Sequence, residues 1–131
     1  MRLLLDTHIW LWSLLEPSRL GRRTAAALDD AANQLWLSPI SIWETLMLAE
    51  RRRVILQPDP ERWVRATLER LPFQEAPMNA EVAMASRALM IPSDDPADRF
   101  IAATARVYEL TLVTADARLR RIPHVAVLPN S

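Results

Sequence analysis

Short apolar runs alternate with longer stretches of helical periodicity along this chain. The apolar runs predict strands buried on both faces, at Arg2–Leu5, Gln34–Leu37, Phe73–Ala76, Thr111–Thr114 and Val125–Leu128. Between them, a cap residue followed by proline marks helix starts at Ser38-Pro39, Asp59-Pro60 and Asp95-Pro96. The predicted helices are Thr7–Leu15, Ser18–Ala32, Ile40–Arg53, one opened by Asp59-Pro60, one from the Asn79 cap to about Met90, one opened by Asp95-Pro96, and a short one near Ala117–Arg121.

Strands that alternate with helices predict a parallel sheet with helices on both faces. The fold class is therefore α/β, a three-layer α/β/α sandwich around a central parallel sheet of four to five strands. No internal repeat or linker divides the chain, so we expect one domain over residues 1–131. Asp6 and His8 interrupt the apolar run that ends at Leu15, which predicts core and not a signal peptide or a membrane span.

Composition narrows the chemistry. The chain has no cysteine, which excludes disulfides, thiolate zinc sites and cysteine nucleophiles and fits a reducing compartment, so we expect a cytoplasmic protein. All 16 basic residues are arginine, which excludes any mechanism that needs lysine. Sixteen acidic residues balance them, so bulk electrostatic coating of nucleic acid is excluded, but a local basic patch is not. With Gly21 as the one glycine, no glycine-rich phosphate loop exists.

Four carboxylates lie at the boundaries of predicted elements. Asp6 ends the first strand and Asp116 follows the fourth, while Glu44 lies early in the helix after the second strand. Asp98 lies in the first turn of the helix before the fourth strand. Ligands of open parallel sheets bind beyond the carboxyl ends of the strands, where the strand order reverses. We expect all four side chains at that edge, Asp98 because a crossover helix runs antiparallel to the strands.

Each carboxylate also has an ordinary structural interpretation, because helix N-termini favour acidic residues. Asp116 could cap the short helix after it, and Ser41-x-x-Glu44 matches a capping box. Gathered together, two carboxylates 4 Å apart repel by about 4 kcal/mol at an effective dielectric of 20. That exceeds the ~1 kcal/mol of a cap, so a cluster requires a cation or raised pKa values. An all-oxygen set favours Mg²⁺ or Mn²⁺ over zinc.

Four segments carry a family resemblance: Leu4–His8, Ser41–Glu44, Asp95–Ala105 and Leu112–Asp116. They resemble the PIN-domain ribonucleases and, more closely, the VapC-type toxins of bacterial toxin–antitoxin pairs. The resemblance follows the family's order over nearly the whole chain, and Asp95–Ala105 is its most specific part. It implies that Asp6 and Asp98 are the metal-binding aspartates, with Thr114 as a polar neighbour of the cluster. It also implies that Asp6, Glu44, Asp98 and Asp116 are the catalytic residues.

The resemblance further implies what such a protein does. It implies an endoribonuclease that uses Mg²⁺, or Mn²⁺, to hydrolyse RNA by a metal-activated water, leaving a 3′ hydroxyl and a 5′ phosphate. It also implies a homodimer without a membrane anchor, inhibited by a cognate antitoxin protein whose C-terminal segment covers the active site.

Two alternatives compete with the nuclease hypothesis. A catalytically silent adaptor of the same fold would bind RNA or a partner without cutting, and it predicts the loss of an acidic position, although none is lost here. A haloacid-dehalogenase-like phosphohydrolase also begins with a strand-end aspartate. That chemistry needs a second aspartate two positions later, where this chain has His8, and a lysine, which the chain lacks.

Arginine and tryptophan give less specific signals. Candidate phosphate contacts are the clusters Arg51-Arg52-Arg53, Arg22-Arg23 and Arg118 with Arg120-Arg121, although solvated helix ends would look the same. Trp43 shares a helix with Ile40 and Met47 and is predicted to lie in the core. Trp10, Trp12 and Trp63 fit the core, a dimer interface or a base-stacking surface, and their aliphatic neighbours favour the first two.

Overall fold

A five-stranded sheet forms the centre of the computed structural model, which describes residues 1–71 and 73–131. Its strands are β1 (Arg2–Leu5), β2 (Gln34–Leu37), β3 (Gln74–Glu75), β4 (Thr111–Thr114) and β5 (Val127–Pro129). Their order across the sheet is β3-β2-β1-β4-β5, and each neighbouring pair is parallel. The predicted parallel sheet is therefore confirmed, with five strands.

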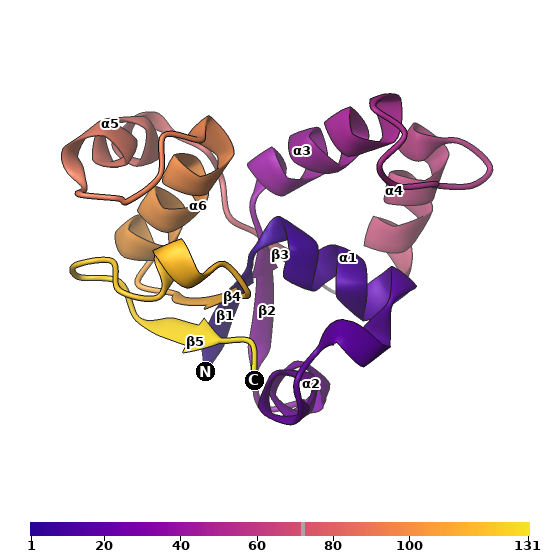
Figure 1. Cartoon of the computed structure of the whole chain (residues 1–131), viewed down its shortest axis with the longest axis horizontal. Helices are drawn as coiled ribbons and strands as arrows, with labels where there is room; N and C mark the ends of the chain where they lie inside the picture. The colour runs from indigo at the N-terminus through magenta and orange to yellow at the C-terminus, as the bar shows by residue number, and fades with distance from the viewer. Residues whose placement is uncertain (72) are drawn as a thin grey trace.

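Helices cover both faces of this sheet (Figure 1). They are α1 (Thr7–Leu15), α2 (Arg22–Asp29), α3 (Pro39–Glu50), α4 (Pro60–Arg70), α5 (Ala80–Ala88) and α6 (Pro96–Val107), with 3₁₀ turns at Pro17–Arg19 and Ala117–Leu119. Figure 1 shows α5 and α6 on one side of the sheet and α1 and α2 on the other. This arrangement is the predicted three-layer α/β/α sandwich.

Alternation along β1 builds the two hydrophobic layers. Leu4 packs with Ile101 of α6 on one face, whereas Leu3 and Leu5 pack with Trp10 of α1 on the other. All three leucines are fully buried, as expected for a central strand whose successive side chains point to opposite faces. No helix in the described ranges is both long and apolar enough to cross a membrane.

The strand order reverses between β1 and β4. From β1 the chain adds β2 and then β3 on one side, and it later returns to place β4 and β5 on the other side of β1. Leu5 is in register with Val113, and the Asp6 N–H donates to the Val113 carbonyl at 2.9 Å. Asp6 therefore lies beside the end of β4, at the carboxyl-terminal edge of the sheet. Parallel α/β folds bind their ligands at this edge.

Two sequence predictions are wrong in detail. The predicted helix Ser18–Ala32 is broken, because Gly21 is the extended N-cap of α2 and donates its N–H to Asn130 Oδ1 at 2.8 Å. Trp43 is 56% exposed and does not lie in the core. Ser41 and Thr45 lie on the buried face of α3. Trp43 is two positions after Ser41, so it points away from that face. The remaining elements differ from their predicted ends by a few residues.

Replacing Gly21 tests how the C-terminal segment holds α2. A Cβ there would lie 1.9 Å from the carbonyl carbon of Ser131, whose oxygen accepts the N–H groups of Arg23 and Thr24 at 2.8 and 3.2 Å. We expect Gly21→Ala to lower the free energy of unfolding by about 1–2 kcal/mol, because these two hydrogen bonds are displaced. Urea unfolding measures the change. In a chain that ends at Asn130 the same substitution should cost markedly less, and an equal cost would contradict the explanation.

Candidate active site

Asp6 is buried at the junction of β1 and α1. Its Oδ1 accepts the Thr7 N–H at 2.9 Å, which makes it the N-cap of α1, and its Oδ2 accepts the Thr114 hydroxyl at 2.6 Å. Burial raises the pKa of Asp6, the hydrogen bonds from Thr114 and Thr7 partly offset this rise, and the nearby charge of Glu44 adds to it. The fold thus keeps a carboxyl group where its charged form is disfavoured.

Glu44 faces Asp6 from α3. The helix starts at Ser38, whose hydroxyl caps Ile40, so Ser41 lies inside the helix and the predicted capping box does not form. Burial raises the pKa of Glu44, and the charges of Asp95 and Asp98 raise it further, while Thr7 and His8 lower it. The Glu44 carboxyl group is therefore free of a capping role.

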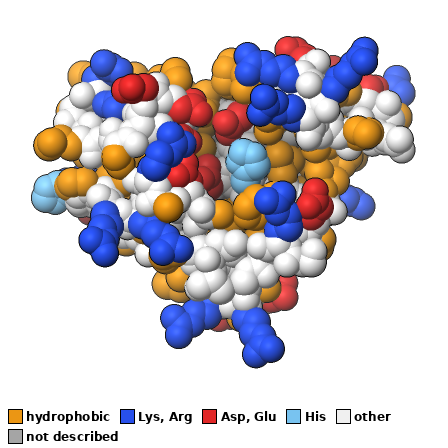
Figure 2. All heavy atoms as spheres, viewed as in Figure 1, with side chains coloured by type: hydrophobic (Ala, Val, Ile, Leu, Met, Phe, Trp, Pro, Cys, Tyr) orange, Lys and Arg blue, Asp and Glu red, His pale blue; other side chains and the backbone are white. Residues whose placement is uncertain are grey.

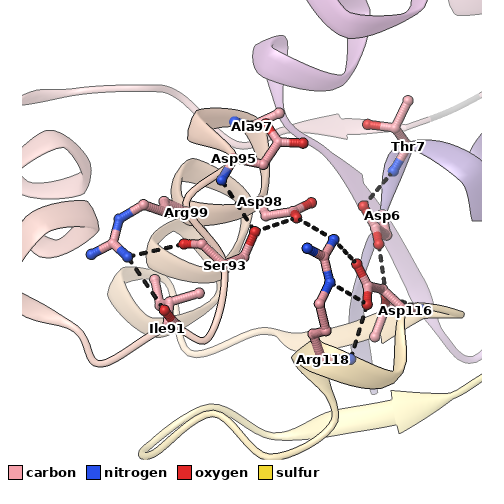
Figure 3. A network of polar contacts seen from close by, with 11 residues as sticks. Asp6, Thr7, Ile91, Ser93, Asp95, Ala97, Asp98, Arg99, Asp116 and Arg118 are labelled. Atoms are coloured by element: carbon pink, nitrogen blue, oxygen red, sulfur yellow. Dashed lines mark hydrogen bonds and ion pairs between the residues drawn. The ribbon is translucent and has the colours of Figure 1, made fainter.

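Asp98 lies in the first turn of α6, where Asp95 is the N-cap through Ala97 N–H at 3.0 Å. The Ser93 hydroxyl donates to Asp98 Oδ2 at 2.8 Å (Figure 3). Burial raises the pKa of Asp98, Ser93 lowers it, and the charges of Asp6, Asp95 and Asp116 raise it. The charge of Asp6 thus reaches Asp98, which places the two carboxyl groups at the same edge of the sheet.

Arg99 fixes the loop that leads into α6. Its guanidinium points away from Asp98 and donates to the carbonyl oxygens of Ser86, Leu89, Ile91 and Ser93 at 3.0 to 3.4 Å. The clamp holds Ser93, and through it Asp98. Arg99 is therefore a positioning residue, and sequence reasoning could not distinguish this role from an ion pair at the site.

Asp116 and Arg118 complete the arrangement from the turn after β4. Asp116 accepts the Arg118 N–H at 2.9 Å as the predicted cap, and its N–H donates to the Thr114 hydroxyl oxygen at 3.0 Å. The Arg118 guanidinium donates to Asp116 Oδ2 at 2.7 Å and to Asp98 Oδ2 at 3.2 Å. These contacts from Arg118 lower the pKa of Asp116, in contrast to the other three carboxyl groups.

The structure thus links three of the four predicted carboxylates, Asp6, Asp98 and Asp116, beyond the ends of β1 and β4. The charge of the fourth, Glu44, raises the pKa of Asp6, but no hydrogen bond joins Glu44 to the other three within the described residues. A continuous polar network links Asp6, Thr114, Asp116, Arg118 and Asp98, from two strand ends and one helix start (Figure 3). From the sequence, Arg118 is a candidate phosphate contact or a solvated helix end, and neither interpretation includes its contact with Asp98. The only signal was its position two residues after a capping aspartate, where a guanidinium can fold back onto the carboxylate.

The donor chemistry of this network fits a hard divalent cation. Within residues 1–71 and 73–131, no three His, Asp or Glu side chains lie close enough to hold a metal ion as they are arranged. The Arg118 guanidinium instead lies between Asp98 and Asp116. Three carboxyl groups still have raised pKa values, so a second cation would be electrostatically favourable, and carboxylate oxygens suit Mg²⁺ or Mn²⁺.

Comparison with known proteins gives consistent matches over the whole chain. Residues 3–125 match the family model described as PIN domain. The chain is 36% identical over 124 residues to ribonuclease VapC22 of Mycobacterium tuberculosis, a match that covers 92% of each chain. VapBC2 from Rickettsia felis, solved with a DNA fragment from its promoter, has a similar structure, with a TM-score of 0.72, 19% identity and 98% of each chain covered. DNA-bound VapBC from Salmonella typhimurium gives a TM-score of 0.70 at 19% identity, covering 100% of this chain and 99% of that one.

These matches confirm the resemblance drawn from the four sequence segments. The family model spans both of the strands whose ends carry the network, from Asp6 at one to Asp116 at the other. The chain therefore belongs to the PIN domain family.

Proposed function

We propose that this protein is a divalent-metal-dependent endoribonuclease that acts as the toxin of a toxin–antitoxin pair. The observation that carries the proposal is the polar network that joins Asp6, Asp98 and Asp116 where the strand order reverses. The charge of Glu44 raises the pKa of Asp6, and Glu44 and Asp98 also have raised pKa values. The 36% identity to a protein named as a ribonuclease supports RNA as the substrate. No acidic position is missing, which favours an enzyme over a silent adaptor.

Each carboxylate has a role in this proposal. Asp6 and Asp98 would hold Mg²⁺, or Mn²⁺, and Glu44 and Asp116 would complete the cluster directly or through water. When bound, the cation would supply a lowered water pKa and offset negative charge on the phosphate oxygens. The Thr114 hydroxyl fixes the position of two of these carboxylate residues. It donates a hydrogen bond to the Asp6 carboxylate and accepts one from the backbone N–H of Asp116.

The proposed partners follow from the relatives. A structure named as a toxin–antitoxin complex from Klebsiella pneumoniae matches 98% of this chain at a TM-score of 0.67. VapBC-5 from Mycobacterium tuberculosis, named as a member of the VapBC family of toxin–antitoxin systems, also matches 98% of this chain, at a TM-score of 0.61. These names support a cognate antitoxin as the partner of this protein. We assign residues 1–131 to a single PIN domain. The proposal includes a homodimer, for which Trp43 offers exposed apolar surface on α3.

Asp98→Asn tests the nuclease itself. We expect RNA cleavage in Mg²⁺ to fall about 100-fold or more, the scale on which loss of one electrostatic stabiliser slows an enzyme. Cleavage of a labelled RNA on denaturing gels measures the rate. Asp94→Asn is the matched control, because Asp94 is exposed and only four residues away, and it should cleave like the unmodified protein. Full activity of Asp98→Asn would end the proposal.

Asp6→Asn tests the electrostatic cost of the buried site. The raised pKa of Asp6 means that the folded state holds the proton more tightly, so stability falls as pH rises through that pKa, and the penalty persists at neutral pH. Without metal at pH 7, Asp6→Asn should therefore unfold a few degrees higher, and the difference should vanish below about pH 4, where the carboxyl group is protonated in both states.

Saturating Mg²⁺ should raise the unfolding temperature of the unmodified protein and leave that of Asp6→Asn nearly unchanged. Circular dichroism melts with EDTA or Mg²⁺ measure both effects. A lower melting temperature for Asp6→Asn in EDTA at pH 7 would show that burial of Asp6 carries no penalty.

Arg118→Gln tests whether the guanidinium offsets the carboxylate charges. We expect a lower melting temperature in EDTA and a larger rise with Mg²⁺, because Asp98 and Asp116 lose their counter-ion and gain more from the metal. Arg120→Gln, two residues further on and also exposed, is the control for removing one charge. Equal responses of the two variants to Mg²⁺ would rule out a counter-ion role for Arg118.

A further inference from the structure

A hollow of about 470 Å³ opens beside the carboxylate network, between α1 and α3. Glu44 and Asp95 form the wall on the side of the network, so the hollow is continuous with the candidate active site. Figure 2 shows this hollowed surface, with acidic side chains on one side and a histidine at its centre. Its volume lies within the ~300–1,000 Å³ of small-ligand sites, enough for one nucleotide.

Three flat groups line the hollow along its α1 side. The rings of His8 and Trp12, one helical turn apart, lie 5.9 Å apart with a tilt of 54°. The guanidinium carbon of Arg19 lies 4.2 Å from the Trp12 ring. His8 and Arg19 are exposed and Trp12 is half-buried, so this stacking column of His8, Trp12 and Arg19 is open to a ligand. Unpaired bases stack on histidine, tryptophan and guanidinium planes.

The opposite wall is basic. Arg51 and Arg53 line the hollow at the end of α3, and within the described ranges neither lies within ion-pair distance of a carboxylate. Arg19 has only a loose pair with Glu16 at 3.8 Å, in which both side chains are more than half exposed. One end of the hollow thus suits a metal-bound phosphate and the other a free phosphate.

We propose that this hollow binds the base of an unpaired nucleotide next to the scissile phosphate. The base stacks on the column of His8, Trp12 and Arg19, and Arg51 and Arg53 contact the following phosphate. The inference rests on the proposed function and deepens it, because it assigns one base beside the scissile phosphate to named side chains of this hollow. A base inside a duplex is stacked on both faces and cannot reach the column.

Abasic RNA tests this directly. The probe is a short single-stranded RNA that the unmodified protein cleaves at one place, made also with one base removed at each position around that place. For the unmodified protein, one position should matter most, with KM rising about tenfold or more and kcat changing less. Trp12→Leu and Arg19→Gln should raise KM on the intact RNA by a similar factor. On the RNA that lacks the base whose removal raises KM most, the two substitutions should raise KM little further.

Two controls make the outcome decisive. Arg106→Gln removes the same charge at the far end of α6 and should leave KM unchanged. Arg19→Gln changes an exposed side chain, so it keeps the test valid if Trp12→Leu unfolds. Anisotropy of the labelled RNA in EDTA gives affinities that do not depend on activity.

The failures are distinguishable. No RNA cleavage by the unmodified protein in Mg²⁺ or Mn²⁺ ends the proposed function. Cleavage with unchanged KM and affinity in both variants overturns only the base site and leaves the hollow to a protein partner. Losses that are fully additive at every abasic position overturn it as well, because the removed base and the removed side chain would then act independently.

Discussion

Repulsion among four carboxylates is the constraint around which this edge of the molecule is built. Asp6, Glu44 and Asp98 carry raised pKa values because burial and mutual repulsion oppose their charge. The hydroxyl groups of Thr114 and Ser93 and the backbone N–H of Thr7 donate to these carboxylates, which reduces the cost without removing it. Such a cluster is poorly explained by fold stability alone, because a neutral side chain at any of these positions would be less costly. The arrangement fits the divalent cation of the proposed function.

Two of these four acidic residues also cap a helix or turn, and the cap hydrogen bond holds the carboxylate in place. Asp6 caps α1 and Asp116 caps the turn after β4, so the structural and the functional interpretations hold for the same side chains. Glu44 and Asp98 make no cap, and they follow the caps made by Ser38 and Asp95 in the same helices. Each of the four carboxylates thus lies at or just after a capped helix or turn start, which holds it on a rigid element.

The sequence predicted the strands, the layers and the meeting edge because these depend on local pattern and on the rules of parallel sheets. Helix starts were equally readable, since the cap and proline signals act locally. The break at Gly21 was not, because its cause is the C-terminal segment, 109 residues away in the chain. The exposure of Trp43 and the contact between Arg118 and Asp98 depend likewise on how elements dock. Such contacts between distant elements cannot be predicted from composition or from the spacing of residues along the chain.

One helix connects the chemistry to the proposed base site. Asp6 caps α1 and Trp12 lies six residues further on, which is about 9 Å along the helix at 1.5 Å per residue. A rigid element therefore sets the spacing between Asp6, the proposed metal ligand, and the stacking column. The proposed base site would also let a chain without net charge bind RNA, because Arg19, Arg51 and Arg53 line one hollow beside the carboxylates and need not coat the whole surface. In this proposal a few arginines at one place do the work of a high net positive charge. Stacking of bases on flat side chains adds affinity for RNA that the net charge of zero does not provide.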